Sequence, residues 1–354
     1  MKSKMSVTVV LSICFTLICS TLPVASSLAQ PAKKPIEMKF ANYTPPVVIL
    51  AYWLIEPWGF RLERLTKGQV KMKYFHGGTL GTAKDSYDIA VTGIADISWS
   101  NINYMPGRFP KSEVFQLPFI PGYHGKRTSL ALWKMFPKYF KDEYKDVKML
   151  WIYCSPAAQL YTAKKQVKTI DDLKGMKLSL HPTQTKALKE LGATPVPLAI
   201  TEIYEALQRG LIDGCFTDNI MAKGFRLYEV CNYCTVMNFY TAPCPWIMNL
   251  KTYNKLPDDV KATLDAVSGT AGIHYNGATA DFGDVRDGEF LRQNGMKFYT
   301  LPESERQKAI QMVQPIYDEW IKKMESKGLP GKEILEEARK WIDEFEGIDH
   351  EFWY

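Results

Sequence analysis

Two cysteines, Cys231 and Cys234, have the CxxC spacing of a redox or zinc site. A redox motif normally opens a helix after a strand, whereas the surrounding residues, VCNYCTVMNFY, are typical of a strand edge. A zinc site needs four ligands at close spacing, and the sequence has neither a second CxxC nor an HxxxH. We therefore predict structural cysteines or one local disulfide here, and no metal.

Other catalytic patterns are missing from the sequence. HGGTLG at 76–81 has glycines but lacks the Gly-Lys-Ser/Thr of a phosphate loop, and neither GxSxG nor HExxH occurs. The five histidines show no metal-ligand spacing: His76, His124, His181, His274 and His350. We expect no catalytic residue and no cofactor, so the chain is predicted not to be an enzyme. Scattered catalytic residues remain the alternative.

A short strand at 176–180 places a polar residue near its tip. Met176, Leu178 and Leu180 alternate with polar residues, and His181-Pro182 ends the run because proline cannot donate to a ladder. Ser179 is the polar residue at the carboxyl end, where ligands gather in open α/β sheets. The strand therefore predicts a binding position at Ser179.

The elements that must position such residues alternate between strands and helices. In the N-terminal third, the pattern predicts strands at 36–42, 70–75 and 94–99 with helices at 48–66 and 86–92 between them. Further elements are expected at 148–153, 176–180, 184–191, 194–197 and 201–209. This order is typical of α/β folds with parallel strands.

One unit of this pattern occurs twice. SYDIAVTGIADISWS at 86–100 and EIYEALQRGLIDGCFT at 202–217 each give a short helix, a glycine, an aspartate and a strand. Gly93 and Gly210 suit the left-handed position after a helix, and Asp96 and Asp213 precede the strands. The repeat predicts two similar lobes with a pocket between them, although such turns also recur by coincidence.

The last fifty residues read as helices with two apolar faces, broken at 328–331. We expect them to pack across the lobes or against another subunit. Pro315 should kink the first of these helices or mark its start.

The N-terminus has the features of an export signal. Lys2 and Lys4 precede an apolar run, and Ser27 and Ala29 are small residues suited to a cleavage site. We predict cleavage after Ala29 and a periplasmic protein; an uncleaved anchor is the alternative. Without residues 1–29 the chain has 42 basic and 38 acidic residues. This small excess of positive charge does not indicate binding to nucleic acid.

Removal of the signal leaves five cysteines: Cys154, Cys215, Cys231, Cys234 and Cys244. An exported protein meets oxidising conditions, so one or two disulfides are compatible with this set. Their odd number would leave at least one thiol unpaired.

Several segments together resemble the solute-binding proteins of TRAP (tripartite ATP-independent periplasmic) transporters. The longest are DLKGMK at 172–177 and LGATPVPLAITEIYEALQRGLIDG at 191–214. LYEV, LPDDV, KFANYTPP, GGTLG, GIADIS, PGRFP and LPF support them along the whole mature chain.

The resemblance implies a bilobal periplasmic-binding-protein fold of class α/β. It has two α/β lobes joined by crossing strands, with a long lobe-spanning helix and C-terminal helices. We expect residues 30–155 plus 246–300 in lobe I, 156–245 in lobe II and 301–354 in helices packing across the lobes. A solute, usually an organic acid, binds in the cleft; the lobes close and the protein docks on membrane permease subunits. Some members dimerise, so a homodimer is compatible with the sequence.

At four positions the sequence departs from the family pattern. Ser179 stands where an arginine usually binds the carboxylate of the ligand, and Gln159 falls on a second basic position. Thr217 and Asp218 stand where asparagine and proline are usual. A carboxylate held by the usual arginine is therefore in doubt, and a neutral or cationic ligand is the alternative. Presentation of a ligand to a membrane sensor is a second alternative.

The predicted ligand-binding residues are Tyr43, Trp99, Asn101, Tyr104, Gln159, Ser179, Thr217, Asp218, Trp246 and Asn249. The aromatic members could hold a planar ligand or a cation, although aromatic residues at strand tips more often belong to the core. Arg108 and Arg127 are the alternative partners for a carboxylate.

Overall fold

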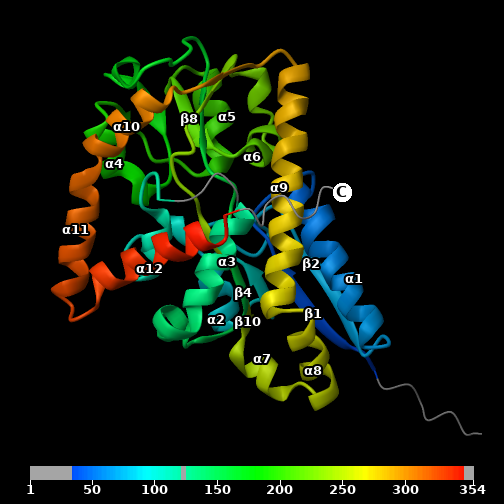
Figure 1. The fold of residues 1–354 in the computed structure, drawn as a ribbon. Helices are drawn as coiled ribbons and strands as arrows, with labels where there is room; N and C mark the ends of the chain where they lie inside the picture. The colour runs from blue at the N-terminus through cyan, green and yellow to red at the C-terminus, as the bar shows by residue number, and fades with distance from the viewer. Residues whose placement is uncertain (1–33, 121–124, 347–354) are drawn as a thin grey trace, which may run out of the picture. The chain divides into compact units, whose positions relative to one another are not determined.

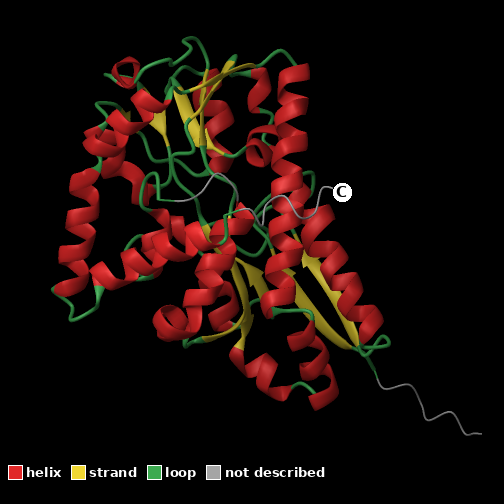
Figure 2. Cartoon of the chain, in the orientation of Figure 1, coloured by secondary structure: helices red, strands yellow, loops and turns green. Residues whose placement is uncertain are grey.

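A computed structural model describes residues 34–120 and 125–346. The predicted signal peptide lies outside these residues. Two separate groups of strands, each flanked by helices, dominate this part of the chain (Figure 2). None of its helices is long and apolar enough to cross a membrane.

The first sheet has five strands in the order β2-β1-β3-β10-β4. Their bounds are β1 Ile36–Ala41, β2 Val70–Phe75, β3 Ile97–Trp99, β4 Val147–Cys154 and β10 Pro243–Asn249. β1 pairs in parallel with β2 and β3, and β10 is antiparallel to both β3 and β4. This sheet is the centre of lobe I.

The second sheet has six strands in the order β11-β9-β5-β8-β6-β7. Their bounds are β5 Gln159–Thr162, β6 Lys177–Ser179, β7 Thr194–Pro195, β8 Gly214–Thr217, β9 Tyr233–Val236 and β11 Lys297–Thr300. β6 pairs in parallel with β7 and β8, and β5 is antiparallel to β8 and β9. From the sequence we placed 297–300 in lobe I; β11 instead pairs with β9 at the edge of this second sheet. A four-residue strand gives no signal of its partner, so only the tertiary structure decides this.

The repeated sequence unit builds the same turn in each lobe. Gly93 and Gly210 follow α2 (Ser86–Thr92) and α5 (Ile200–Gln208) with φ of 78° and 67°, the left-handed region that glycine tolerates best. A carboxylate oxygen of Asp96 accepts the backbone N–H of Lys39 at 2.8 Å, and Asp213 accepts that of Lys177 at the same distance. Each aspartate thus fastens the turn to the neighbouring parallel strand, a contact that the internal repeat did not itself predict.

Two connecting segments, 155–158 and 237–242, cross between the lobes side by side. Backbone hydrogen bonds join them from Ser155 N–H to Ala242 C=O at 2.9 Å and from Ala158 N–H to Tyr240 C=O at 2.8 Å. β4 therefore continues into β5 and β9 into β10 through a paired hinge.

Helices cover both sheets. In lobe I they are a π-helix at Leu50–Ile55, α1 Glu56–Leu65, α2, α3 Gly125–Met135, α7 Leu250–Lys255 and α8 Asp258–Ala266. In lobe II they are α4 Thr185–Glu190, α5 and α6 Asn219–Gly224. The 25-residue helix α9, Gly269–Gln293, runs beside both lobes (Figure 1) and packs on α3 and β4 of one lobe and on α6 of the other.

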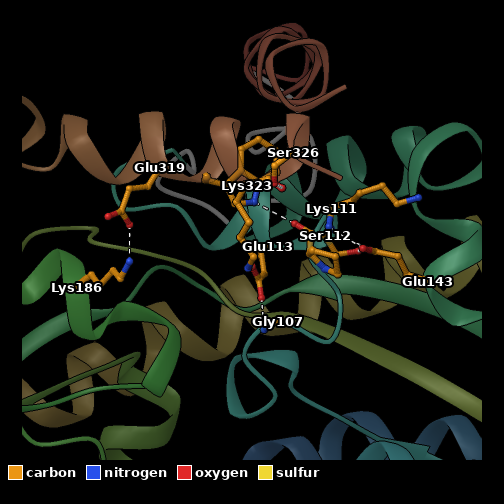
Figure 3. Close-up of polar contacts among 11 residues, drawn as sticks. Gly107, Lys111, Ser112, Glu113, Glu143, Lys186, Glu319, Lys323 and Ser326 are labelled. Carbon is orange, nitrogen blue, oxygen red and sulfur yellow. Dashed lines mark hydrogen bonds and ion pairs between the residues drawn. The ribbon is translucent and has the colours of Figure 1, made fainter. Parts of the chain in front are cut away.

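Three C-terminal helices follow: α10 Glu303–Met312, α11 Gln314–Glu325 and α12 Gly331–Glu344. Pro315 lies in the first turn of α11, so it marks a helix start rather than a kink. Figure 3 shows α11 bound to both lobes: Glu319 pairs with Lys186 of α4 at 2.5 Å, and Lys323 pairs with Glu113 of lobe I at 3.1 Å. α11 therefore contacts an element of each lobe.

Close packing of α9 on lobe I depends on a glycine. A Cβ atom on Gly272 would lie 2.5 Å from the indole of Trp151 on β4, well inside van der Waals contact. We predict that Gly272→Ala lowers the free energy of unfolding by about 1–3 kcal/mol despite the better helix propensity of alanine. Urea unfolding followed by circular dichroism measures the change.

Glu289→Ala, on the exposed side of the same helix, is the matched control and should change stability by no more than about 0.5 kcal/mol. A Gly272→Ala protein as stable as the control would contradict the packing argument.

Candidate functional site

A cavity lies between the two lobes and against the crossing segments. Its volume is about 70 Å³, which is several times the volume that one buried water needs. Lobe I contributes Tyr43, Ile49, Leu50, Leu54, Trp99, Asn101, Tyr104 and Tyr153; lobe II contributes Leu180, His181, Leu198, Ile200, Ile203, Phe216, Thr217, Asp218, Ile220 and Met221. Ser155, Pro156, Ala158, Tyr240, Ala242, Cys244, Thr279 and Ala280 complete the lining.

The wall in lobe I is a set of locked aromatic rings at the tips of β1 and β3. Tyr43 stacks on Trp99 with ring centroids 4.8 Å apart and meets Tyr104 edge-on at 6.0 Å. The indole N–H of Trp99 donates to the Tyr153 hydroxyl at 3.1 Å, and the Tyr104 hydroxyl accepts the Ile200 N–H at 3.3 Å. Because these polar atoms are already paired, the rings offer the cavity mainly apolar area.

The tip of β8 in lobe II supplies Thr217 and Asp218. Asp218 caps α6, and its carboxylate accepts the Met221 N–H at 2.8 Å. Burial, with a smaller contribution from Asp287, raises the pKa of Asp218 to about 6. Burial and the nearby Asp218 also raise the pKa of Asp284 on α9 well above its usual range. This end of the cavity therefore disfavours negative charge.

The tip of β6 supplies Leu180 and His181. The Nδ1 atom of His181 and the hydroxyl of Ser179 are both buried, and neither has a hydrogen-bond partner among the described residues. Burial lowers the pKa of His181 to about 4. The ring is therefore neutral at pH 7.

Within the described part of the chain, neither lysine nor arginine lines the cavity. Arg108 forms two hydrogen bonds with Asp88, at 2.8 and 2.6 Å, and lies over the Tyr87 ring. Arg127 donates to the Ile342 carbonyl and pairs with Asp343, which ties α3 to the end of α12. Neither arginine lines the cavity where a carboxylate would enter.

Six of the ten residues predicted from the sequence line the cavity: Tyr43, Trp99, Asn101, Tyr104, Thr217 and Asp218. They come from three separate strand tips, those of β1, β3 and β8, which the two sheets bring together.

The other four predicted residues lie outside the lining. Trp246 is fully buried in lobe I, stacked on Trp151 at 4.3 Å. Gln159 accepts the N–H groups of Met237 and Asn238 and so ties the crossing segments together. Asn249 caps α7 and donates to the Ala90 carbonyl, and Ser179 is buried behind the tip of β6. Strand-end positions do not separate these residues from the lining, because such positions also face the core and the crossing segments.

Sequence reasoning missed His181, Tyr153 and Tyr240 in the lining. His181 was treated only as the end of a strand. The alternation that marked Ser179 could have pointed to it, because residues two apart in an extended chain share a side.

The cysteines are free thiols. Cys154, Cys215, Cys231, Cys234 and Cys244 are all buried and unbridged, so the local disulfide is absent. Burial raises the pKa of Cys231 to about 12, which leaves the thiol unreactive. No group of metal-binding side chains occurs within 34–120 and 125–346.

Comparison with known proteins settles the family. Residues 50–323 match the family described as bacterial extracellular solute-binding protein, family 7. The chain belongs to this family. It is a TRAP solute-binding protein with the bilobal α/β fold.

Solved structures of other members are similar over most of this chain. A TRAP solute-binding protein from Rhodoferax ferrireducens T118, in complex with copurified benzoate, is 28% identical with a TM-score of 0.84. A marine metagenome protein specific for aromatic acid ligands, in complex with metahydroxyphenylacetate, is 27% identical with a TM-score of 0.85. Each similarity covers 88% of this chain and 99% of the other.

A curated relative binds a different acid. The 2,3-diketo-L-gulonate-binding periplasmic protein YiaO of Escherichia coli K12 is 25% identical over 62% of this chain and 68% of its own length. Such relatives are solute-binding proteins rather than enzymes.

The raised pKa of Asp218 predicts a pH-dependent effect of its replacement. The folded state favours the protonated, neutral form of Asp218. The folding free energy that this protonation contributes is fully present below pH about 4 and is lost as the pH rises through about 6. Asp218→Asn keeps the helix cap and removes this loss. Relative to the parent, the variant should gain about 1–3 kcal/mol between pH 4 and pH 7, measured by urea unfolding.

Asp318→Asn, an exposed carboxylate on α11, is the control and should give no such pH-dependent gain. A difference between Asp218→Asn and parent that stays constant with pH would argue against a buried, proton-binding Asp218.

Proposed function

We propose that this TRAP solute-binding protein captures a small aromatic carboxylic acid in the interlobe cavity and delivers it to the membrane permease. The observation that carries the proposal is the locked aromatic wall formed by Tyr43, Trp99 and Tyr104. We also propose that the protein reaches the periplasm through cleavage after Ala29. A homodimer stays a prediction.

The shape and chemistry of the lining support an aromatic ligand. Flat rings on the lobe I side oppose branched aliphatic side chains of lobe II, among them Ile200, Ile203 and Ile220. A planar ring between these surfaces buries apolar area on both of its faces. A sugar acid would instead leave its hydroxyl groups against apolar walls, at a cost in unpaired polar groups.

Similar structures support an acid. The two proteins that hold benzoate and metahydroxyphenylacetate are the same fold over nearly their whole length. A carboxylate can find neutral donors on this lining, such as the side chains of Asn101 and Thr217.

Asp218 favours a second candidate, a neutral or cationic aromatic ligand. An ionised Asp218 beside aromatic rings would attract an ammonium group and repel a carboxylate. Presentation of the ligand to a membrane sensor uses the same cavity, and two adjacent genes for TRAP membrane subunits would favour transport.

A thermal-shift screen of residues 30–354 separates the ligand classes. We expect benzoate and 3-hydroxybenzoate to raise the melting temperature more than benzamide, phenyltrimethylammonium or glucuronate, because a ligand that binds only the folded state stabilises it. A largest shift with phenyltrimethylammonium would reverse the assignment.

Replacement of Trp99 tests the aromatic wall. Trp99→Phe keeps a ring but loses contact area and the hydrogen bond to Tyr153, so we expect benzoate to bind about three- to tenfold more weakly in calorimetry. Trp133→Phe, on α3 outside the cavity lining, is the control and should bind like the parent. Equal affinity of both variants would contradict a ligand stacked on Trp99.

A further inference from the structure

Buried polar atoms without partners gather at the tip of β6. The Ser179 hydroxyl and the His181 Nδ1 are both buried, and neither has a hydrogen-bond partner among the described residues. Nine in ten buried polar groups in proteins are hydrogen-bonded, so two exceptions two residues apart need an explanation. A ligand group in the cavity would supply the partner that His181 lacks, whereas Ser179 lies outside the lining.

His181 faces the cavity in a fixed orientation. Its ring is half-buried and meets Tyr104 edge-on at 4.6 Å and Tyr240 at 5.8 Å. Its backbone is extended, with φ of −62° and ψ of 146°, and Pro182 directly follows. Both neighbouring rings and the proline restrict the imidazole.

His181 differs in charge from the other titratable side chains of the described lining. The other titratable groups there become negative or stay neutral: Tyr43, Tyr104, Tyr153, Asp218, Tyr240 and Cys244. Tyr104 from lobe I and Tyr240 from the crossing segment face the ring directly, and Asp218 reaches the cavity from the tip of β8. Among the lining side chains that the structure describes, only His181 can carry a positive charge.

We propose that His181 takes up one proton from solvent when a carboxylate enters the cavity, and that the imidazolium then donates from Nδ1 to a carboxylate oxygen. This inference rests on the proposed function. The ligand enters as an anion and the proton as a cation, so the occupied cavity gains no net charge. His181 would thereby replace the arginine that the family resemblance places at Ser179.

The ionisation of His181 agrees with this scheme. Burial lowers the pKa of His181 to about 4, so the ligand-free ring is neutral at pH 7, whereas an adjacent carboxylate raises it. Binding then couples to proton uptake. Above pH about 5 the affinity for a carboxylate should fall about tenfold for each unit of pH, until the pKa of the occupied site is reached.

Titration calorimetry with benzoate tests the proposal. At pH about 5.5, 6.5 and 7.5, in two buffers of different ionisation enthalpy, we expect uptake approaching one proton per benzoate and the tenfold steps in affinity. His181→Gln should abolish the uptake, and His274→Gln, exposed on α9, should behave like the parent. Asp218→Asn should keep the uptake, which separates a proton on His181 from one on Asp218.

NMR titration of the His181 ring in the parent protein gives a readout that does not depend on a variant folding. We expect a neutral ring at pH 6.5 without benzoate and a charged ring with it.

Each contrary result has a distinct meaning. Benzoate that binds without proton uptake, or with uptake that persists in His181→Gln, overturns the role of His181 and leaves the proposed function standing. Benzamide that binds where benzoate does not overturns both the acid ligand and this inference. Failure of every aromatic acid to bind does the same.

Discussion

The hydrogen bonds between the two crossing segments are the constraint on which the rest of the structure depends. Segments 155–158 and 237–242 pair with each other, and Gln159 adds two further bonds to the second segment. Because β4 continues into β5 and β9 into β10, this pairing fixes how the two sheets face each other. Ser155, Ala158 and Tyr240 also line the cavity, so the same residues belong to the crossing segments and to the cavity wall. A motion of the lobes therefore acts directly on whatever occupies the cavity.

The electrostatics of the cavity follow from its burial. Asp218 and His181 are both shifted towards their neutral forms, and Arg108 and Arg127 are engaged elsewhere in the structure. A low-dielectric cavity makes an unpaired charge costly. In the proposed scheme, the charge of the occupied site is thus decided by the ligand together with the proton that His181 takes up, rather than by a permanent cation in the wall.

Helices outside the sheets hold the two lobes together. α9 reaches lobe I through glycines that admit Trp151 and Lys126 and reaches lobe II through α6, where Asn219 donates to Asp284. α11 joins both lobes on its own side through ion pairs with Lys186 and Glu113. The exposed pairs contribute little energy individually, so the apolar contact of the helices is the stronger tie.

Local features of the fold were determined by the sequence itself. The glycines and aspartates of the repeated unit, Gly93 with Asp96 and Gly210 with Asp213, specify a turn whose geometry depends on a few adjacent residues. Alternation and helical spacing likewise predict most elements, because they record which face of a segment is buried. The family motifs then identified the bilobal fold and the capture of a solute.

Only the tertiary structure decided which strand tips meet. Trp99 and Trp246 are both aromatic residues of neighbouring strands, yet one lines the cavity and the other is enclosed by Trp151 and Trp58. Gln159 reads as a polar tip but serves the hinge, and His181 reads as a strand end but faces the cavity. These differences depend on contacts between residues far apart in the chain. No pattern of neighbouring residues records such contacts, and packing of the two lobes alone determines them.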